Sequence, residues 1–130
     1  MSGEKDLRTL LTSMSPHLND GEYVFTTAPA GEVPAGTRPV ATMWEQEGLT
    51  LVLPRADADR EGLPYDYVAA WITLEVHSAL DAVGLTAAFA TALASAGLSC
   101  NVIAGFHHDH LFVPHTEAPR ALQVLTSLTH

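Results

Sequence analysis

The chain has 130 residues, 47% hydrophobic and 16% charged, which is typical of one compact unit or two small lobes and excludes a disordered chain. A formal net charge of −9 disfavours binding to a phosphate backbone, so we expect no nucleic-acid partner. No stretch approaches the ~20 apolar residues of a membrane-spanning helix, and MSGEKDLRTLL lacks the pattern of a signal peptide. We therefore expect a cytoplasmic protein without membrane contact.

The first half of the chain predicts short helices and strands. Apolar residues on one helical face predict a helix over Glu4–Met14, which ends at Ser15-Pro16. A loop rich in Gly and Pro is predicted at Ala28–Arg38, and a short charged helical turn at Ala56–Gly62. The predicted strands are Glu22–Thr27, Pro39–Gln46 and Leu49–Leu53, the last two forming a hairpin.

The second half begins with a buried strand, Ala69–Val76, followed by a compact turn at His77–Gly84. Leu85, Phe89, Leu93 and Ala96 at helical spacing predict a helix with Gly97 as its left-handed end, and Leu98–Gly105 predicts a returning strand. Strand, helix and strand of this length form the first half of a ferredoxin-like fold. A further strand, His110–Val113, precedes a last helix with Thr116 as its cap and Leu122, Leu125 and Leu128 facing inward. No repeat of fixed period is evident.

The second half resembles the ACT domain, the small ligand-sensing module of amino-acid metabolism. The resemblance lies in the order of three segments, which are the strand Ala69–Val76, the stretch HSALDAVGLTAAFATALASAGLSCNVIAG and the stretch HDHLFVP. This order resembles most closely that of the stand-alone ACT-like proteins of bacteria, which are similar to aspartokinase regulatory domains and cytosolic arginine sensors. The resemblance implies an α+β, ferredoxin-like fold of two ACT-like βαββαβ-type lobes, with antiparallel sheets and helices on one face. We place an N-terminal ACT-like lobe at residues 1–65 and a C-terminal ACT domain at residues 66–130.

The turn before the predicted helix is the first candidate site. Free backbone N–H groups at a helix start suit a carboxylate, and Asp81 could pair with an ammonium group. The alternative is that Ser78 or Asp81 caps the helix and Gly84 allows close packing. The resemblance favours ligand binding, because Asp81 stands three residues before the glycine, although Val83 replaces a proline of the family pattern. It also implies a role for Asn101. The predicted amino-acid-binding residues are Ser78, Leu80, Asp81, Val83, Gly84 and Asn101.

A second candidate is the His107–His110 segment, since histidine and carboxylate groups can bind divalent metals. In a hairpin, however, His108 and His110 share one face, whereas His107 and Asp109 point away. Cys100 lies in an apolar strand, where burial keeps a thiol inert, and we expect Trp44 and Trp71 at core or interface positions. No catalytic or cofactor motif is recognisable.

The sequence therefore predicts a non-catalytic regulatory module without a cofactor, which binds an amino acid and forms a homodimer through the edge that ferredoxin-like sheets leave open. The alternatives are an ACT-like scaffold for protein interaction that binds no ligand, and a metal-binding protein that uses the His107–His110 hairpin.

Overall fold

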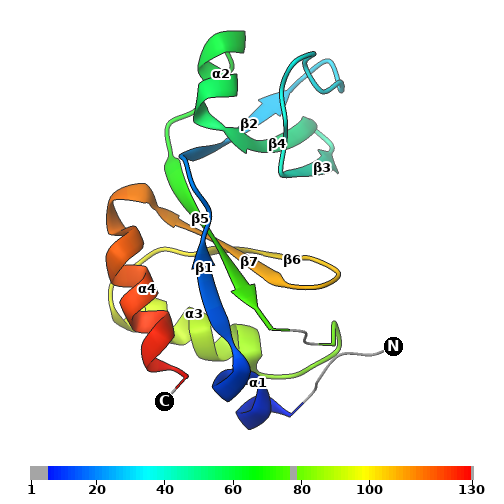
Figure 1. The fold of residues 1–130 in the computed structure, drawn as a ribbon. Helices are drawn as coiled ribbons and strands as arrows, with labels where there is room; N and C mark the ends of the chain where they lie inside the picture. Colours follow the sequence, from blue (N-terminus) through cyan, green and yellow to red (C-terminus); the bar gives the residue numbers. More distant parts are fainter. Residues whose placement is uncertain (1–5, 77–78, 130) are drawn as a thin grey trace. The chain divides into compact units, whose positions relative to one another are not determined.

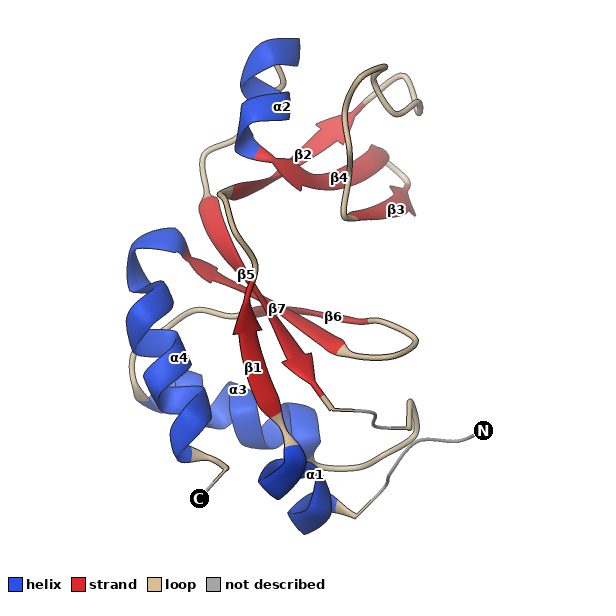
Figure 2. Ribbon diagram, in the orientation of Figure 1, coloured by secondary structure: helices blue, strands red, loops and turns tan. Residues whose placement is uncertain are grey.

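The computed structural model describes residues 6–76 and 79–129. Short helices and strands alternate along the chain (Figure 1; coloured by element type in Figure 2). In chain order they are α1 (Leu7–Ser13), β1 (Ser15–Leu18), β2 (Tyr23–Ala28), β3 (Ala41–Glu45), β4 (Gly48–Pro54), α2 (Arg55–Glu61), β5 (Val68–Glu75), α3 (Leu85–Ser95), β6 (Asn101–Ala104), β7 (Asp109–Pro114), a 3-10 turn (His115–Glu117) and α4 (Ala118–Ser127). They form two compact units, a middle unit of Asp20–Ala69 and a terminal unit made of the segments before and after it.

The terminal unit is a sheet in the order β1-β5-β7-β6, covered on one face by α1, α3 and α4 (Figure 2). Alternate residues of β5, namely Ala70, Ile72 and Leu74, point into the core between sheet and helices. There they meet Phe89 of α3 and Leu125 of α4, all fully buried. The period of two in the strand and the helical spacing in α3 thus bury the residues that the sequence pattern predicts.

The middle unit is built on the sheet order β3-β4-β2, with the first residues of β5 beside β2. Its separate core consists of side chains from β2, β4 and α2. These are Val24, Ala28, Leu49, Leu51, Leu53 and Ala58. Together the two units confirm the predicted α+β, ferredoxin-like architecture with antiparallel sheets.

The two units repeat one structural segment at a spacing of 60 residues. Leu51, Pro54 and Arg60 at the β4–α2 junction correspond to Leu111, Pro114 and Arg120 at the β7–α4 junction. The hairpin register is the same, because Ala41 pairs with Val52 and Asn101 with Phe112. The prediction of two ACT-like lobes is therefore confirmed in this segment, although no sequence repeat of fixed period is evident. Few identical residues remain at matching positions, so the sequence alone does not show the repeat.

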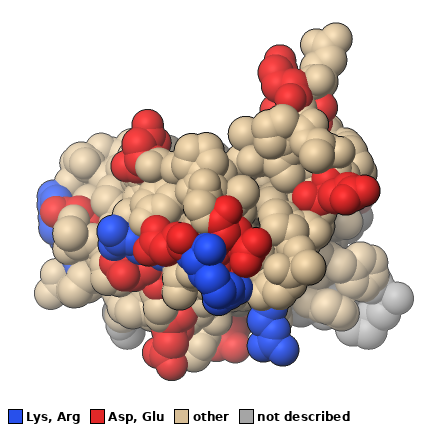
Figure 3. All heavy atoms as spheres, turned by 90° about the horizontal axis from the view of Figure 1, so that it is seen from above, with Lys and Arg blue, Asp and Glu red and all other residues tan. Residues whose placement is uncertain are grey.

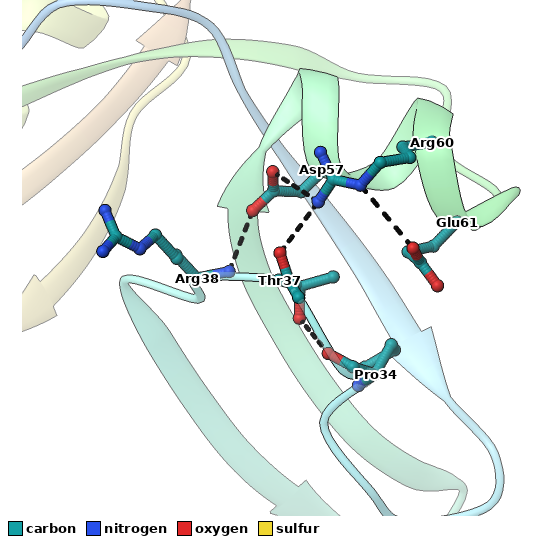
Figure 4. A network of polar contacts seen from close by, with 7 residues as sticks. Pro34, Thr37, Arg38, Asp57, Arg60 and Glu61 are labelled. Carbon is teal, nitrogen blue, oxygen red and sulfur yellow. Dashed lines mark hydrogen bonds and ion pairs between the residues drawn. The ribbon is translucent and has the colours of Figure 1, made fainter.

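An equivalent arginine makes the same pair of hydrogen bonds in each copy of the repeat. Arg60 Nη2 donates to Asp57 at 3.0 Å and to the carbonyl of Gly36 at 2.8 Å, as Figure 4 shows. Arg120 likewise donates to Glu117 at 3.2 Å and to the carbonyl of Ala96. In the terminal unit the accepting carbonyl lies at the end of α3, whereas in the middle unit it lies in the loop of residues 29–40. This loop therefore takes the place of the first helix in the middle unit.

Several predicted element boundaries hold and others do not. The left-handed end at Gly97 (φ +78°) is confirmed. The predicted helical turn that ends at Gly62 is α2, and Gly62 is also left-handed (φ +66°). The strand β1 is absent from the predictions, because Ser-Pro-His-Leu has no alternating pattern and is held as a strand by pairing with β5. Thr116 does not cap the last helix, since it lies inside the 3-10 turn that precedes α4.

Other corrections concern side chains and strand length. The buried stripe of α4 is Ala118, Ala121 and Leu125, whereas Leu122 and Leu128 are half-buried beside it. The returning strand is shorter than predicted, because β6 begins at Asn101. Trp44 is not a core residue of this chain, since 72% of it is exposed.

The compact units do not follow a single cut in the sequence. Residues up to Asn19 belong with the segment from Ala70 onward, so the N-terminal helix and β1 complete the C-terminal half. The linear division into residues 1–65 and 66–130 stays a prediction about the two sequence modules.

Asp57 is expected to hold the loop of residues 29–40 against α2. Its carboxylate accepts the backbone N–H of Arg38 at 2.8 Å as well as the Arg60 bond, and the Arg38 bond, followed by that of Arg60, lowers the pKa of Asp57. Asp57→Ala should lower the free energy of unfolding by about 1–2 kcal/mol in urea denaturation, because both donors lose their acceptor. The matched variant Glu61→Ala removes a pair to the same arginine at 3.6 Å and should cost less than about 0.5 kcal/mol. Equal losses in the two variants would contradict the assignment.

Candidate functional site

The strand-to-helix loop leaves β5 after Glu75 and enters α3 at Leu85. Gly84 occupies the N-cap with φ +102°, a backbone conformation that other residues rarely adopt. A Cβ at this position would come within 3.1 Å of Leu7 Cδ2 in α1. The expected close packing at Gly84 is therefore present, and it fixes the end of the loop against α1.

The loop presents polar and apolar side chains to solvent. Asp81 is exposed, and Leu80 and Val83 have exposed fractions of 69% and 83%. Ser78 lies outside the described residues. Asp81 does not occupy the N-cap position, which belongs to Gly84, because α3 begins four residues after Asp81. Gly84, the N-cap residue, has no side chain with which to cap the first-turn N–H groups of α3.

Asn101 lies far from this loop within the same chain. It opens β6 and pairs with Phe112, whose ring stacks on Trp71 of β5 at a centroid distance of 6.3 Å. The loop begins after Glu75, and Val76 lies about 16 Å beyond Trp71 along the extended chain. The structure therefore does not bring Asn101 and the loop together around one small ligand in a single chain.

A groove beside the loop adds residues that the sequence did not indicate. Leu7, which packs on Gly84, also lines this groove together with side chains of α1 and the end of α4. Arg8 contributes a cationic side chain and Asp6 an anionic one. The Asp6 carboxylate caps α1 by accepting the N–H of Thr9 at 3.0 Å. The sequence pattern could not indicate these groove residues, because the groove joins segments more than 70 residues apart.

The histidine segment forms a hydrogen-bonded cluster on the helix-free face of the sheet. Trp71 Nε1 donates to His110 Nδ1 at 3.0 Å, and the Thr73 hydroxyl lies 3.2 Å from the same nitrogen. Asn19 donates to the Thr73 hydroxyl at 3.0 Å. Since His110 Nδ1 accepts from Trp71, the neutral ring carries its proton on Nε2.

Metal ligation finds no geometric support in residues 6–76 and 79–129, where no three His, Cys, Asp or Glu side chains are placed to hold one ion. His107 instead meets Phe106 edge-on at 5.0 Å, and His108 Nδ1 lies 3.5 Å from the carbonyl of Val76. Burial raises the pKa of Cys100 to about 11, so its thiol stays protonated and unreactive at neutral pH.

Charges on the surface are mixed. On the face drawn in Figure 3, arginine side chains lie beside carboxylates and do not gather into one basic patch. Ion pairs such as Arg55–Glu22 at 3.3 Å and Arg60–Asp57 at 3.0 Å account for this mixing. No helix in the described ranges combines the length and the hydropathy needed to cross a bilayer.

The described fold is ferredoxin-like, and in its terminal unit a loop ending in Gly84 connects the buried strand β5 to the helix α3. These features are typical of small ACT-type modules. Family comparison agrees, since residues 2–70 and residues 67–127 each match a model described as ACT domain. The chain belongs to the ACT-domain family.

Solved structures place the chain among close and distant relatives. A Vibrio cholerae protein of unknown function, described as a possible transport protein, is 49% identical over 95% of this chain and 96% of its own, with a TM-score of 0.85. An Agrobacterium tumefaciens protein is 21% identical over 90% of both chains, with a TM-score of 0.73. The regulatory subunit of aspartate kinase from Thermus thermophilus shares the fold at 9% identity, over 92% of this chain and 99% of its own, with a TM-score of 0.67. Comparison with curated proteins gave no match.

The His110 cluster should make stability depend on pH. Burial lowers the pKa of His110 below its ordinary 6.5, His108 adds to this effect, and Asp109 opposes it. The folded state therefore binds fewer protons than the unfolded state just below pH 6.5, so stability falls as pH decreases through that window. His110→Asn keeps an acceptor for Trp71 and removes the titration.

From about pH 7 to about pH 5, the melting temperature of His110→Asn should fall less than that of the wild type. His107→Asn, at an exposed position of the same hairpin, serves as the control and should follow the wild-type curve. A wild-type pH dependence in His110→Asn would contradict the account.

Proposed function

We propose that this protein is a non-catalytic regulatory ACT module that binds an amino acid or a similar small metabolite at the strand-to-helix loop of its terminal unit. The observation that carries the proposal is the loop itself, in which an exposed carboxylate, Asp81, stands before a helix whose N-cap residue, Gly84, has no side chain to cap its first N–H groups. Both family matches are ACT domains, and one neighbour of the same fold is a regulatory subunit of aspartate kinase.

The chemistry of the loop suits a free amino acid. The first N–H groups of α3 and the positive end of its dipole attract a carboxylate, while Asp81 offers a partner for an ammonium group. Leu80 and Val83 supply exposed apolar surface for a side chain. Arg8 in the neighbouring groove offers a cation for the carboxylate. A few polar groups next to apolar ones are the usual composition of a small-ligand site.

The packing of Gly84 against Leu7 holds one end of the proposed binding loop in place. This contact couples the loop to α1, and α1 packs into the same core as β5 and α3 through Leu10. A ligand that binds the loop would therefore bias the position of α1, which is a route by which a module without a catalytic step can transmit a signal. We include cytoplasmic location and homodimer formation in the proposal.

The proposed role of Asn101 differs from the role that the family pattern implies. A ligand bound at the loop does not reach Asn101 of the same chain, because Asn101 pairs with Phe112 beside Trp71, and the chain runs about 16 Å from Trp71 to Val76 at the loop. Asn101 would join the site only through a second copy.

A thermal-shift screen against the common amino acids tests the proposal. One amino acid should raise the melting temperature, by about 2.7 kcal/mol of added stability at a hundredfold excess over Kd. Asp81→Ala should abolish this shift without unfolding the protein, since Asp81 is exposed. Asn101→Ala, also at an exposed position, is the matched control and should keep the shift.

The other outcomes distinguish the rival functions. No shift with any amino acid would favour the interaction scaffold, for which Leu80 and Val83 provide exposed apolar contacts. A shift with divalent metal alone would favour the histidine hairpin. An equal loss in Asn101→Ala would show that the ligand bridges two copies.

A further inference from the structure

The groove beside the proposed binding loop is lined mainly by leucines. It runs along α1 and the C-terminal end of α4 (Figure 1), and its apolar lining residues are Leu7, Leu11 and Leu128. Leu7 is 36% exposed, and Leu11 and Leu128 are half-buried, so part of this apolar surface stays accessible. The volume of the groove is about 660 Å³, which lies within the range of sites that hold small molecules.

The helical spacing of α1 explains how these side chains reach the groove. Leu10 points into the core of the terminal unit and is fully buried. Leu7 and Leu11 lie one turn apart beside this core-facing position. Arg8 and Thr12, also one turn apart, line the groove next to the leucines. The helix α1 therefore turns one stripe to the core and a second stripe to the groove.

Leu7 connects the groove to the binding loop. It packs on Gly84, where a Cβ would lie 3.1 Å from Leu7 Cδ2, and Gly84 is the N-cap of α3. Leu11 follows one helical turn, about 5.4 Å, further along α1. A ligand whose carboxylate meets the first N–H groups of α3 thus has Leu7 next to its side chain, and a longer side chain extends to Leu11.

The charges in the groove do not favour an ionised side chain. Its charged lining residues are one carboxylate, Asp6, and one guanidinium, Arg8. The Asp6 carboxylate accepts the N–H and the hydroxyl of Thr9, at 3.0 and 2.8 Å, and Arg8 is the cation offered to the ligand's carboxylate. A charged side chain would therefore leave water for a leucine-lined surface without gaining a partner of its own, whereas an apolar side chain gains from burial.

We propose that this leucine-lined groove receives the side chain of the ligand, so that the ligand is an amino acid with a large apolar side chain, such as leucine or methionine. The inference rests on the proposed function, because it concerns the side chain of the ligand bound at the loop. It makes α1 the element that selects this side chain, and it makes Leu11, Thr12 and Leu128 the residues that determine the selection.

Isothermal titration calorimetry with free amino acids tests the groove. Leucine should bind the wild type with a Kd at least roughly tenfold lower than that of alanine, because the alanine side chain is too short to reach Leu11. Glutamate is long enough but charged, and it should bind at least roughly tenfold more weakly than leucine.

A charge placed in the groove should change this preference. Thr12→Lys adds a cation beside the leucines, so the preference for leucine over glutamate should fall at least roughly tenfold. Ser13→Lys is the matched control, since Ser13 is exposed on the same helix and is not one of the groove-lining residues. Both hydroxyls donate to a carbonyl of the preceding turn, Thr12 to Arg8 at 3.0 Å and Ser13 to Thr9 at 2.7 Å. Ser13→Lys should keep the wild-type preference.

The outcomes separate this inference from the proposed function. If amino acids bind the wild type but leucine has no advantage over alanine, the groove assignment is overturned and binding at the loop stands. An unchanged preference in Thr12→Lys, or an equal change in Ser13→Lys, also overturns the groove assignment alone. If no amino acid binds the wild type, the proposed function fails and the groove assignment fails with it.

Discussion

The alternation of side chains along β5 is the constraint on which the terminal unit depends. Ala70, Ile72 and Leu74 point into the core that seats α1, α3 and α4. Trp71 and Thr73 point to the helix-free face and hold the His110 cluster. A shift of one residue in register would exchange these two sets, burying an indole and a hydroxyl among leucines. The position of the strand end, and so the place where the ligand loop begins, follows from the same register.

Patterns within a few residues predicted most of this fold. The strand of β5, the helix α3 and the glycines that end α2 and α3 follow from periodicity and from backbone preference. β1 could not be predicted this way, because its extended backbone depends on a partner more than 50 residues away. The repeat of the β4–α2 and β7–α4 junctions was also hidden, since the helix of one unit corresponds to a loop in the other.

Only the part of the candidate site that lies within a few residues of sequence could be predicted. Gly84 and Asp81 belong to one short loop, so sequence spacing places them correctly. Asn101 and Arg8 depend on tertiary arrangement. β6 begins at the end of the sheet opposite the loop, and α1 reaches the loop through packing of Leu7 on Gly84. The family pattern indicates which residue types bind a ligand, but it does not show which of these residues share a pocket within one chain. The strand register determines which of them lie together.

Amide chemical shifts of the isotopically labelled protein, recorded while amino acids are added, test the central claim most directly. The account predicts that one amino acid moves the amides of residues 79–88 and of α1, and leaves Asn101 and the Trp71–His110 cluster unmoved. Shifts confined to the His110 cluster or to the middle unit would contradict binding at the loop. The same would be true if no amino acid moved any amide of the loop.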